Sequence, residues 1–503
     1  MFALAVLIGI YSYGIFALGV LGILTSANIS AFTLSWVVIT AIYFHNKLNF
    51  RLPKTDRITK LLILILGIQC LINLIGALGP ELGFDALWYH LTLPKIWLTR
   101  QVIDFIPGPV FKYSVMPKLT ETLYAAGLFA GGAIIPKLIH YGFGLMSLIV
   151  TYKLARKFLS VKYSLLSVLI LTSNLVFAWQ STTAYVDLTR TFFESLALLL
   201  FIKDKYTASA ITLGLAVSSK LIALASLPIY ILLLIFSKKS VQEITKYVLL
   251  TFLIPLPWFI FAYISTGNPF YPVFSDILGP HQISLNLLDF WTLFTKNADP
   301  LSPIYIITAP LVLLINFKKQ SRGVQLIFLY SLLSLLAWFI TPRTGGGRFI
   351  LPYLPALSVT TALVIKNLKD QPLHKFIVGL ILFIAFTSLV YRLFANYKFL
   401  PVLLGTQTTS DFLSDHLNFD FGDYYDTDNF IGSRISHSDP VLVSGINNLF
   451  YLPSENFYHD SEKTDLSYKY LLQRSPDSQL LIDKSWKLIH ENPKTQTKIF
   501  EKI

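Results

Sequence analysis

The sequence predicts an all-α polytopic membrane protein of about 13 transmembrane helices, followed by a small α/β domain outside the bilayer. Of its 503 residues, 54% are hydrophobic and only 14% are charged, whereas soluble domains carry about 25% charged residues. Apolar runs recur from residue 2 to residue 393, and many approach the length that a helix needs to cross a bilayer. Residues 394–503 are polar instead, so they are expected to form a separate domain.

The apolar runs predict thirteen spans, of which 206–219 and 221–237 are short. The run 2–24 has no basic residues before its apolar stretch, so we expect a retained span rather than a cleaved signal peptide. Successive loops must lie on alternate faces of the membrane, and counting a further apolar stretch, 119–133, as a span would break this order. We therefore expect it to form a helix that lies in the interface or dips into the bundle. The spans are 2–24, 31–45, 61–79, 137–153, 162–180, 184–202, 206–219, 221–237, 246–264, 303–317, 324–340, 349–365 and 375–393.

Lysine and arginine residues predict the orientation of the bundle. Six connecting segments hold 20 basic and 4 acidic residues, and the positive-inside rule places them in the cytoplasm. Residues 394–503, with a net charge of −5, then lie outside. The overall charge of +13 is therefore a topology signal, and nothing in its distribution points to nucleic acid. The six segments are 46–60, 153–162, 203–205, 237–246, 318–322 and 366–375.

Ionisable residues of both signs collect on the predicted outer side. Such groups at membrane depth are costly, and they are candidates for function by default. Together they describe a site for an anionic ligand with a carboxylate nearby. The acidic members are Glu81, Asp85, Asp104, Glu121, Asp187, Glu194, Asp276, Asp289 and Asp299, and the basic members include Lys95, Arg100, Lys112, Lys118, Lys220, Arg343 and Arg348.

The segment 79–95 follows the third span and is the richest in candidate residues. Asp85 stands beside Trp88, Tyr89 and His90, and a carboxylate next to apolar surface can act as a general base on a hydroxyl or amine. Asp85 could also cap a helix over residues 86–93. Glu81 is the second catalytic candidate, and Tyr89, His90 and Lys95 are candidates for substrate binding. A lone histidine such as His90 more often hydrogen-bonds locally than ligates a metal.

Three cations are candidates for binding a phosphate. Lys220 lies at a predicted outer turn, and Arg343 and Arg348 flank a glycine triplet where backbone amides and guanidinium groups can converge. Snorkelling at the membrane interface is the alternative. Asp187 and Arg190 are three residues apart and share a helix face, either in the site or as a local ion pair.

No cofactor is indicated, and a divalent metal is possible but unsupported. The pair Asp426 and Asp428 could bind a divalent ion, but it lacks an EF-hand pattern, and acidic loops are usually solvated. The lone cysteine, Cys70, lies in an apolar run and is expected to pack. In the tail, 440–444 and 479–482 are predicted strands and 409–417 is a predicted helix.

The order of motifs resembles that of the GT-C superfamily of glycosyltransferases, in the style of the protein O-mannosyltransferase and aminoarabinose-transferase branch. The motifs together span residues 79–355. Unlike that branch, this chain has its loop acids four residues apart, and two spans precede the acidic loop's span. The matching segments are Glu81 to Lys95, Pro117 to Tyr124, Tyr185-Val186-Asp187, Ser219-Lys220, Thr266-Gly267-Asn268-Pro269 and Arg348 to Pro355.

The resemblance implies an inverting transferase that moves a hexosyl or pentosyl group from a polyprenyl-phosphate carrier to a lipid, glycan or protein acceptor. The reaction would take place on the non-cytoplasmic face of the plasma or inner membrane. By position, the role of general base falls on Asp85, and that of holding the carrier phosphate on Lys220, Arg343 and Arg348. The phosphate would be the leaving group, and nearby cations would stabilise its charge.

Two other classes remain open from the sequence. A transporter or flippase of lipid-linked sugars would carry inverted repeats and broken helices near the midplane, and the sequence has no visible repeat. An O-antigen ligase or polymerase would favour paired outer-loop arginines over an aspartate in the first loop. The transferase hypothesis requires Asp85, Lys220 and Arg348 to meet in one outer cavity.

Overall fold

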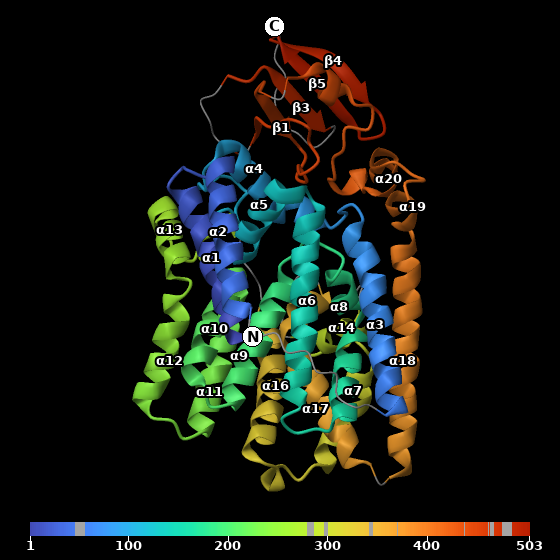
Figure 1. Ribbon diagram of the computed structural model, residues 1–503. Coiled ribbons are helices and arrows are strands. Elements are labelled where there is room, and N and C mark those ends of the chain that lie inside the picture. Colours follow the sequence, from blue (N-terminus) through green and yellow to red (C-terminus); the bar gives the residue numbers. More distant parts are fainter. Residues whose placement is uncertain are drawn as a thin grey trace.

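The computed structural model shows a bundle of helices with a small β-sheet domain at one end (Figure 1). The sheet domain lies beyond the ends of α3, α6 and α18, on the side where the first outer loop is found. The structure describes residues 1–45, 56–278, 286–295, 300–341, 346–369, 371–436, 438–460, 462, 467–474 and 485–503.

Helices account for most of the described chain. The α-helices are α1 Phe2–Val20, α2 Ser26–Phe44, α3 Arg57–Leu78, α4 Thr92–Arg100, α5 Leu119–Gly131, α6 Ile134–Ala155, α7 Val161–Thr172, α8 Leu175–Gln180, α9 Asp187–Ile202, α10 Tyr206–Ser219, α11 Leu227–Phe236, α12 Val241–Leu253, α13 Leu256–Thr266, α14 Asp289–Thr295, α15 Ile304–Thr308, α16 Arg322–Ile340, α17 Leu354–Asn367, α18 Pro372–Tyr397, α19 Leu400–Leu403, α20 Thr409–His416 and α21 Phe430–Arg434. Tighter or wider turns are η1 Ala86–His90, η2 Leu221–Ser226, η3 Asp276–Leu278, η4 Pro310–Leu314, η5 Phe317–Lys319, η6 Gly346–Phe349, η7 Leu351–Tyr353 and η8 Phe419–Phe421.

Every predicted span coincides with a helix or an interrupted helix, but the count of thirteen spans is not confirmed. Among the described residues, six helices are long and apolar enough to cross a bilayer alone: α1, α2, α3, α6, α16 and α18. The pair α12 and α13 adds a seventh if the two form one span bent by 58°. The other segments are shorter or broken, so length and composition do not assign each of them a crossing of its own.

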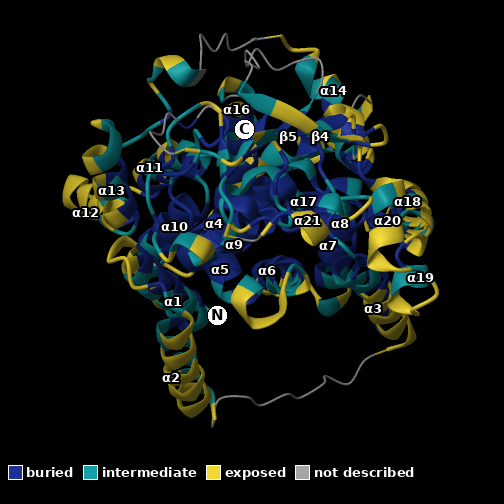
Figure 2. Cartoon of the chain, turned by 90° about the horizontal axis from the view of Figure 1, so that it is seen from above, coloured by how far each residue is buried: buried dark blue, intermediate teal, exposed yellow. Residues whose placement is uncertain are grey.

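The centre of the bundle is α9, whose side chains are buried from Asp187 to Phe201. It packs most extensively on α10 and α6. Seen from above, the buried helices gather around α9, whereas α2 stands at the rim with an exposed surface (Figure 2). Only 6% of the apolar window of α2 is buried inside the protein, so most of its apolar surface is left for lipid.

The loop predicted on the outer side, residues 80–136, forms short helices on the end of the bundle, and its last three residues belong to α6. A wide π-type turn, η1, follows Asp85, and α4 continues from it. The Asp85 side chain makes no capping hydrogen bond, so the predicted cap is not formed. The stretch 119–133 forms α5, which is buried over most of its length against α1, α4 and α6 and thus dips into the bundle.

The C-terminal domain contains a five-stranded sheet in the order β2-β1-β3-β5-β4, within the part of the chain that is described. Strand β1 runs parallel to β2 and to the central strand β3, and β5 runs antiparallel to β3 and β4. The predicted strand 440–444 and helix 409–417 correspond to β1 and α20, whereas 479–482 lies outside the described residues. The strands are β1 Val441–Ser444, β2 Phe457–His459, β3 Tyr470–Arg474, β4 Trp486–Asn492 and β5 Thr497–Lys502.

A buried lysine fixes the point where the chain leaves α3 and enters this loop. Lys137, on α6, is 1% exposed, and its Nζ donates hydrogen bonds to the carbonyls of Gly76 (2.9 Å), Gly79 (2.6 Å) and Pro80 (3.1 Å). The Gly76 carbonyl also accepts from the amide of Gly79 (3.3 Å), whereas no backbone amide of the described residues donates to the carbonyls of Gly79 and Pro80, which follow the end of α3. The ammonium group therefore satisfies the C-terminus of α3 and sets where the acidic loop begins.

We expect Lys137→Met to lower the melting temperature of the protein in detergent by several degrees. The substitution leaves buried carbonyls without a donor, and a hydrogen bond to a charged group contributes about 2 kcal/mol. Thermal unfolding of the purified variant measures the effect. Lys60→Met, at the exposed far end of α3, is the control and should melt like the wild type. Equal melting temperatures for both variants would contradict the role of Lys137.

Candidate active site at the outer end of the bundle

Asp85 is bound on one side of its carboxylate and open on the other. Its Oδ2 accepts hydrogen bonds from Arg348 Nη1 (2.6 Å) and from the hydroxyl of Tyr89 (3.3 Å). Its Oδ1 has no hydrogen bond to any described residue, and the side chain is 12% exposed. Among the described residues, the arrangement therefore leaves one oxygen of the Asp85 carboxyl group without a hydrogen-bond donor.

Asp187 and Lys220 form a second ion pair from two other segments. Asp187 begins α9, Lys220 separates α10 from η2, and their Oδ1 and Nζ atoms are 2.6 Å apart. The side chain of Lys220 is 17% exposed and that of Asp187 only 1%. Arg190 pairs with Glu194 rather than with Asp187, so the local ion pair considered from the sequence is not formed.

The two ion pairs belong to one site. The Lys220 Nζ lies 4.9 Å from the ring centroid of Phe349, and the Arg348 Cζ lies 5.3 Å from the same centroid. Arg348 also interacts electrostatically with Asp187. Asp85, Lys220 and Arg348, which are far apart in sequence, therefore lie close together. Arg343, the third predicted cation, lies outside the described residues.

Glu81 is fully buried, and its carboxylate is occupied by backbone amides. Oε1 accepts from the amides of Leu82 (2.9 Å) and Gly83 (2.6 Å), and Oε2 accepts from the amide of Ala184 (2.6 Å). Burial raises the pKa of Glu81, although Lys137 and these amides oppose the shift. The geometry gives Glu81 a structural role, joining the loop to the segment before α9, and leaves Asp85 as the accessible acid.

His90 contacts a carboxylate rather than the open space. Its Nδ1 lies 2.8 Å from Oε1 of Glu121, and Lys118 donates to the same oxygen (3.0 Å). Burial lowers the pKa of His90. Burial alone would raise the pKa of Glu121, but Lys118 and His90 outweigh it and hold that pKa at about 2.

This second cluster connects to Asp85 through Tyr89. The Lys118 Nζ lies 5.1 Å from the ring centroid of Tyr89, whose hydroxyl donates to Asp85. Lys118 and Glu121 were visible in the sequence only as ionisable residues on the outer side. Their pairing with His90 required the fold, because α5 lies far along the chain from η1.

The C-terminal domain also holds the loop, through Tyr451, which no sequence pattern indicated, and through Lys95, which was predicted to bind substrate. The hydroxyl of Tyr451 accepts from the amide of Glu81 and donates to its carbonyl, both at 3.0 Å. Lys95 donates to the carbonyls of Phe450 (3.1 Å) and Leu452, and burial lowers the pKa of Lys95 to about 8. Lys95 therefore anchors the domain and does not face Asp85.

A polar layer lies one helical turn deeper, below Asp187. Arg190 Nε donates to Glu194 (2.6 Å), and Arg190 also donates to the hydroxyl of Tyr353 (3.1 Å). Ser226 donates to the other oxygen of Glu194 (2.6 Å). These side chains are buried and mutually paired, as charges in an apolar bundle must be. The layer joins α9, η2 and η7 and thereby fixes the segments that carry Asp187, Lys220 and Arg348.

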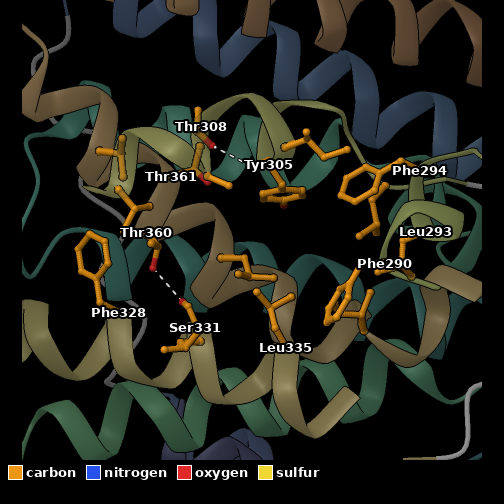
Figure 3. Close-up of a pocket in the computed structure, with 18 of the residues that line it drawn as sticks. Phe290, Leu293, Phe294, Tyr305, Thr308, Phe328, Ser331, Leu335, Thr360 and Thr361 are labelled. Atoms are coloured by element: carbon orange, nitrogen blue, oxygen red, sulfur yellow. Dashed lines mark hydrogen bonds between the residues drawn. The ribbon is translucent and has the colours of Figure 1, made fainter. Parts of the chain in front are cut away.

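An apolar cavity of about 390 Å³ opens between α14, α15, α16 and α17 (Figure 3). Its walls are mainly aromatic and aliphatic, with Phe290 and Leu335 on one side and Tyr305 facing them. Ile350 also lines it, two residues after Arg348. The cavity therefore begins close to the cationic end of the site.

No three His, Cys, Asp or Glu side chains gather as a metal site in the described part of the chain. In the tail, Asp426 accepts from the amide of Gly432 (2.8 Å), and Asp428 pairs with His490 (2.7 Å). Both acids of the D-x-D pair thus have partners of their own.

We expect Tyr451→Phe to loosen the acidic loop. It removes both hydrogen bonds to Glu81, each contributing about 1 kcal/mol, so amide exchange at residues 81–83 should accelerate about tenfold. Hydrogen–deuterium exchange by mass spectrometry measures this. Tyr425→Phe is the matched control, since the Tyr425 hydroxyl has no hydrogen bond within the described residues. Unchanged exchange in Tyr451→Phe would show that the domain does not hold the loop.

No protein-family model matches the chain, and no curated protein matches its sequence. Similar solved structures exist. ArnT from Cupriavidus metallidurans in the apo state gives a TM-score of 0.55 at 12% identity, covering 88% of this chain and 98% of that chain. The same protein bound to undecaprenyl phosphate gives 0.51, with the same identity and coverage.

The oligosaccharyltransferase of Archaeoglobus fulgidus, in complex with zinc and sulfate, is also similar. Its TM-score is 0.50 at 14% identity, covering 82% of this chain and 68% of that chain. Both proteins are GT-C glycosyltransferases. At these identities the likeness concerns the fold, and it agrees with the resemblance of the motifs: the chain has the GT-C fold.

Proposed function

We propose that the protein is a membrane glycosyltransferase that moves a sugar from a polyprenyl-phosphate carrier to an acceptor hydroxyl or amine. The observation that carries this proposal is the Asp85 carboxylate, with Oδ2 held by Arg348 and Oδ1 open, beside the Lys220–Asp187 pair. A base and two cations at one accessible place suit a nucleophilic displacement whose leaving group is a phosphate. The GT-C fold supports the same reaction class.

In the proposed reaction, Asp85 Oδ1 takes the proton from the acceptor group as its oxygen or nitrogen attacks the anomeric carbon. The bond between that carbon and the phosphate oxygen breaks, and its electron pair leaves with the carrier phosphate. A single displacement of this kind inverts the anomeric centre. Lys220 and Arg348 stabilise the charge on the leaving group, and the hydrogen bond from Arg348 orients Asp85.

The apolar cavity next to Ile350 supports a lipid-linked donor. A polyprenyl phosphate has an anionic head and an apolar tail, and this chain has a cation, Arg348, two residues before Ile350, which lines the apolar cavity. One of the similar structures contains undecaprenyl phosphate. We therefore propose that the head binds at Lys220 and Arg348 and that the first part of the tail occupies the cavity. The proposal places the site and the C-terminal domain on the non-cytoplasmic side, as the positive-inside rule predicts.

We expect Asp85→Asn to reduce sugar transfer by about 10²- to 10⁴-fold, the range for losing a general base. The measurement is transfer in membranes of a deletion strain, read by mass spectrometry of lipid-linked sugars and glycans, in which the donor should accumulate. Asp104→Asn, in the same loop, is the control. Asp85→Asn should fold, since the amide oxygen still accepts from Arg348. Normal transfer by this variant would overturn the assignment of the base.

We expect the double variant Asp187→Asn, Lys220→Gln to bind undecaprenyl phosphate at least about tenfold more weakly, the loss of one charge-assisted hydrogen bond. Removing both partners avoids leaving a buried unpaired charge. Titration of the detergent-solubilised protein with undecaprenyl phosphate measures the affinity. Lys203→Gln, at the other end of α9, is the control. Unchanged binding by the double variant would place the phosphate elsewhere.

A further inference from the structure

Aromatic rings continue from Asp85 to the open surface of the C-terminal domain. Phe84, the residue before Asp85, lies 5.0 Å from the ring of Phe421 and 5.9 Å from the ring of Trp88, centroid to centroid. Trp88 in turn lies 5.6 Å from the ring of Tyr113. We call Phe421, Phe84, Trp88 and Tyr113 the aromatic wall.

The aromatic wall is rigid at its inner end and exposed at its outer end. Trp88 Nε1 donates to the carbonyl of Val110 (2.9 Å), which fixes the indole ring. Phe421, in η8, is 68% exposed, although it is a large apolar side chain on a domain outside the bundle. An exposed aromatic side chain that continues a preformed row of rings marks a binding surface.

The inner end of the wall is polar and faces the proposed base. The Tyr113 hydroxyl has no hydrogen-bond partner in the described part of the chain, and Lys112 lies against the Tyr113 ring, 5.4 Å from its centroid. The Tyr113 ring lies 5.1 Å from the ring of Tyr89, centroid to centroid, and the Tyr89 hydroxyl donates to Asp85. An unpaired hydroxyl beside a row of rings suits a ligand that carries hydroxyl groups on an apolar frame.

We propose that the aromatic wall binds a neutral glycan acceptor, whose terminal hydroxyl reaches Asp85. The C–H face of a pyranose ring carries positively polarised hydrogens that complement the negative face of an aromatic ring. Rings spaced along the wall can support successive sugars, and the hydroxyl of Tyr113 can bond to one of them. This inference rests on the proposed function and names the acceptor class for the same site.

Two other acceptor classes fit the wall less well. An extended peptide gains affinity from main-chain hydrogen bonds to an exposed strand edge, but the edges of the described sheet are β2 and β4, and no wall residue belongs to either strand. A lipid acceptor would be held among the spans, whereas the wall runs from Phe84, in the loop after α3, to Phe421 in η8 of the C-terminal domain.

The test uses the full chain in nanodiscs, without donor, and three probes in separate saturation-transfer NMR experiments. The probes are maltotetraose, a neutral threonine-containing pentapeptide and dihexanoylphosphatidylglycerol. We expect saturation to reach the ring C–H protons of maltotetraose. The signal should fall at least about fivefold in Phe421→Ala and return in Phe421→Trp, since stacking depends on the ring. Leu488→Ala, an exposed apolar residue of β4 in the same domain, should leave it unchanged.

Three results would overturn the proposal: no maltotetraose signal, a signal that does not depend on Phe421, or a Phe421-dependent signal from the peptide or the lipid instead. Asp85→Asn separates this inference from the proposed function, because the variant should keep maltotetraose binding while it loses transfer. If maltotetraose binds but Asp85→Asn transfers sugar normally, the aromatic wall is still a glycan-binding surface and Asp85 is not the base.

Discussion

The pairing of charges at the border of an apolar bundle is the constraint on which the site depends. A carboxylate or guanidinium group is expensive to remove from water unless it is paired and hydrogen-bonded. The Asp85–Arg348 pair joins residues 263 positions apart, and the Asp187–Lys220 pair joins two more segments. Breaking one pair would leave a charge stranded near lipid, so each pair holds its segments in one place. The groups proposed to react and the groups that secure the local fold are therefore partly the same.

The described C-terminal domain extends this constraint beyond the bundle. Tyr451 bonds to both backbone groups of Glu81, whose own carboxylate holds the loop to Ala184. Glu81 precedes η1 in the sequence, and Lys95, in α4, follows it and also bonds to the domain. The turn that carries Asp85 is thus tied from the domain, from the segment before α9 and from α4. A short loop with few regular hydrogen bonds of its own obtains a defined shape in this way.

Much of this architecture follows from local patterns in the sequence, and part of it does not. Apolar periodicity predicts the helices, and the mixed charges around Asp85, Lys220 and Arg348 predict a site, because both signals are carried by neighbouring residues. The number of membrane crossings could not be read in the same way, since interrupted helices such as α12 and α13 are as apolar as a single span. The partners of Glu81 and His90 lie on distant segments, and only the packing of those segments reveals them. Nothing in the sequence around Tyr451 predicts its contact with Glu81, because it is one of several tyrosines in a polar domain.

The balance of charges in the site has a consequence for discrimination among sugar donors. The charges of the paired residues that the structure describes, Asp85, Asp187, Lys220 and Arg348, sum to zero, so these four offer little long-range attraction to a soluble anion. A nucleotide sugar brings two phosphates and no tail, and it would find neither a net positive field nor a use for the cavity beside Ile350. A lipid-linked monophosphate needs only local contacts to its head, because its tail keeps it in the membrane plane. The balanced charge of the proposed site would therefore disfavour nucleotide sugars as donors, without a residue that repels them directly.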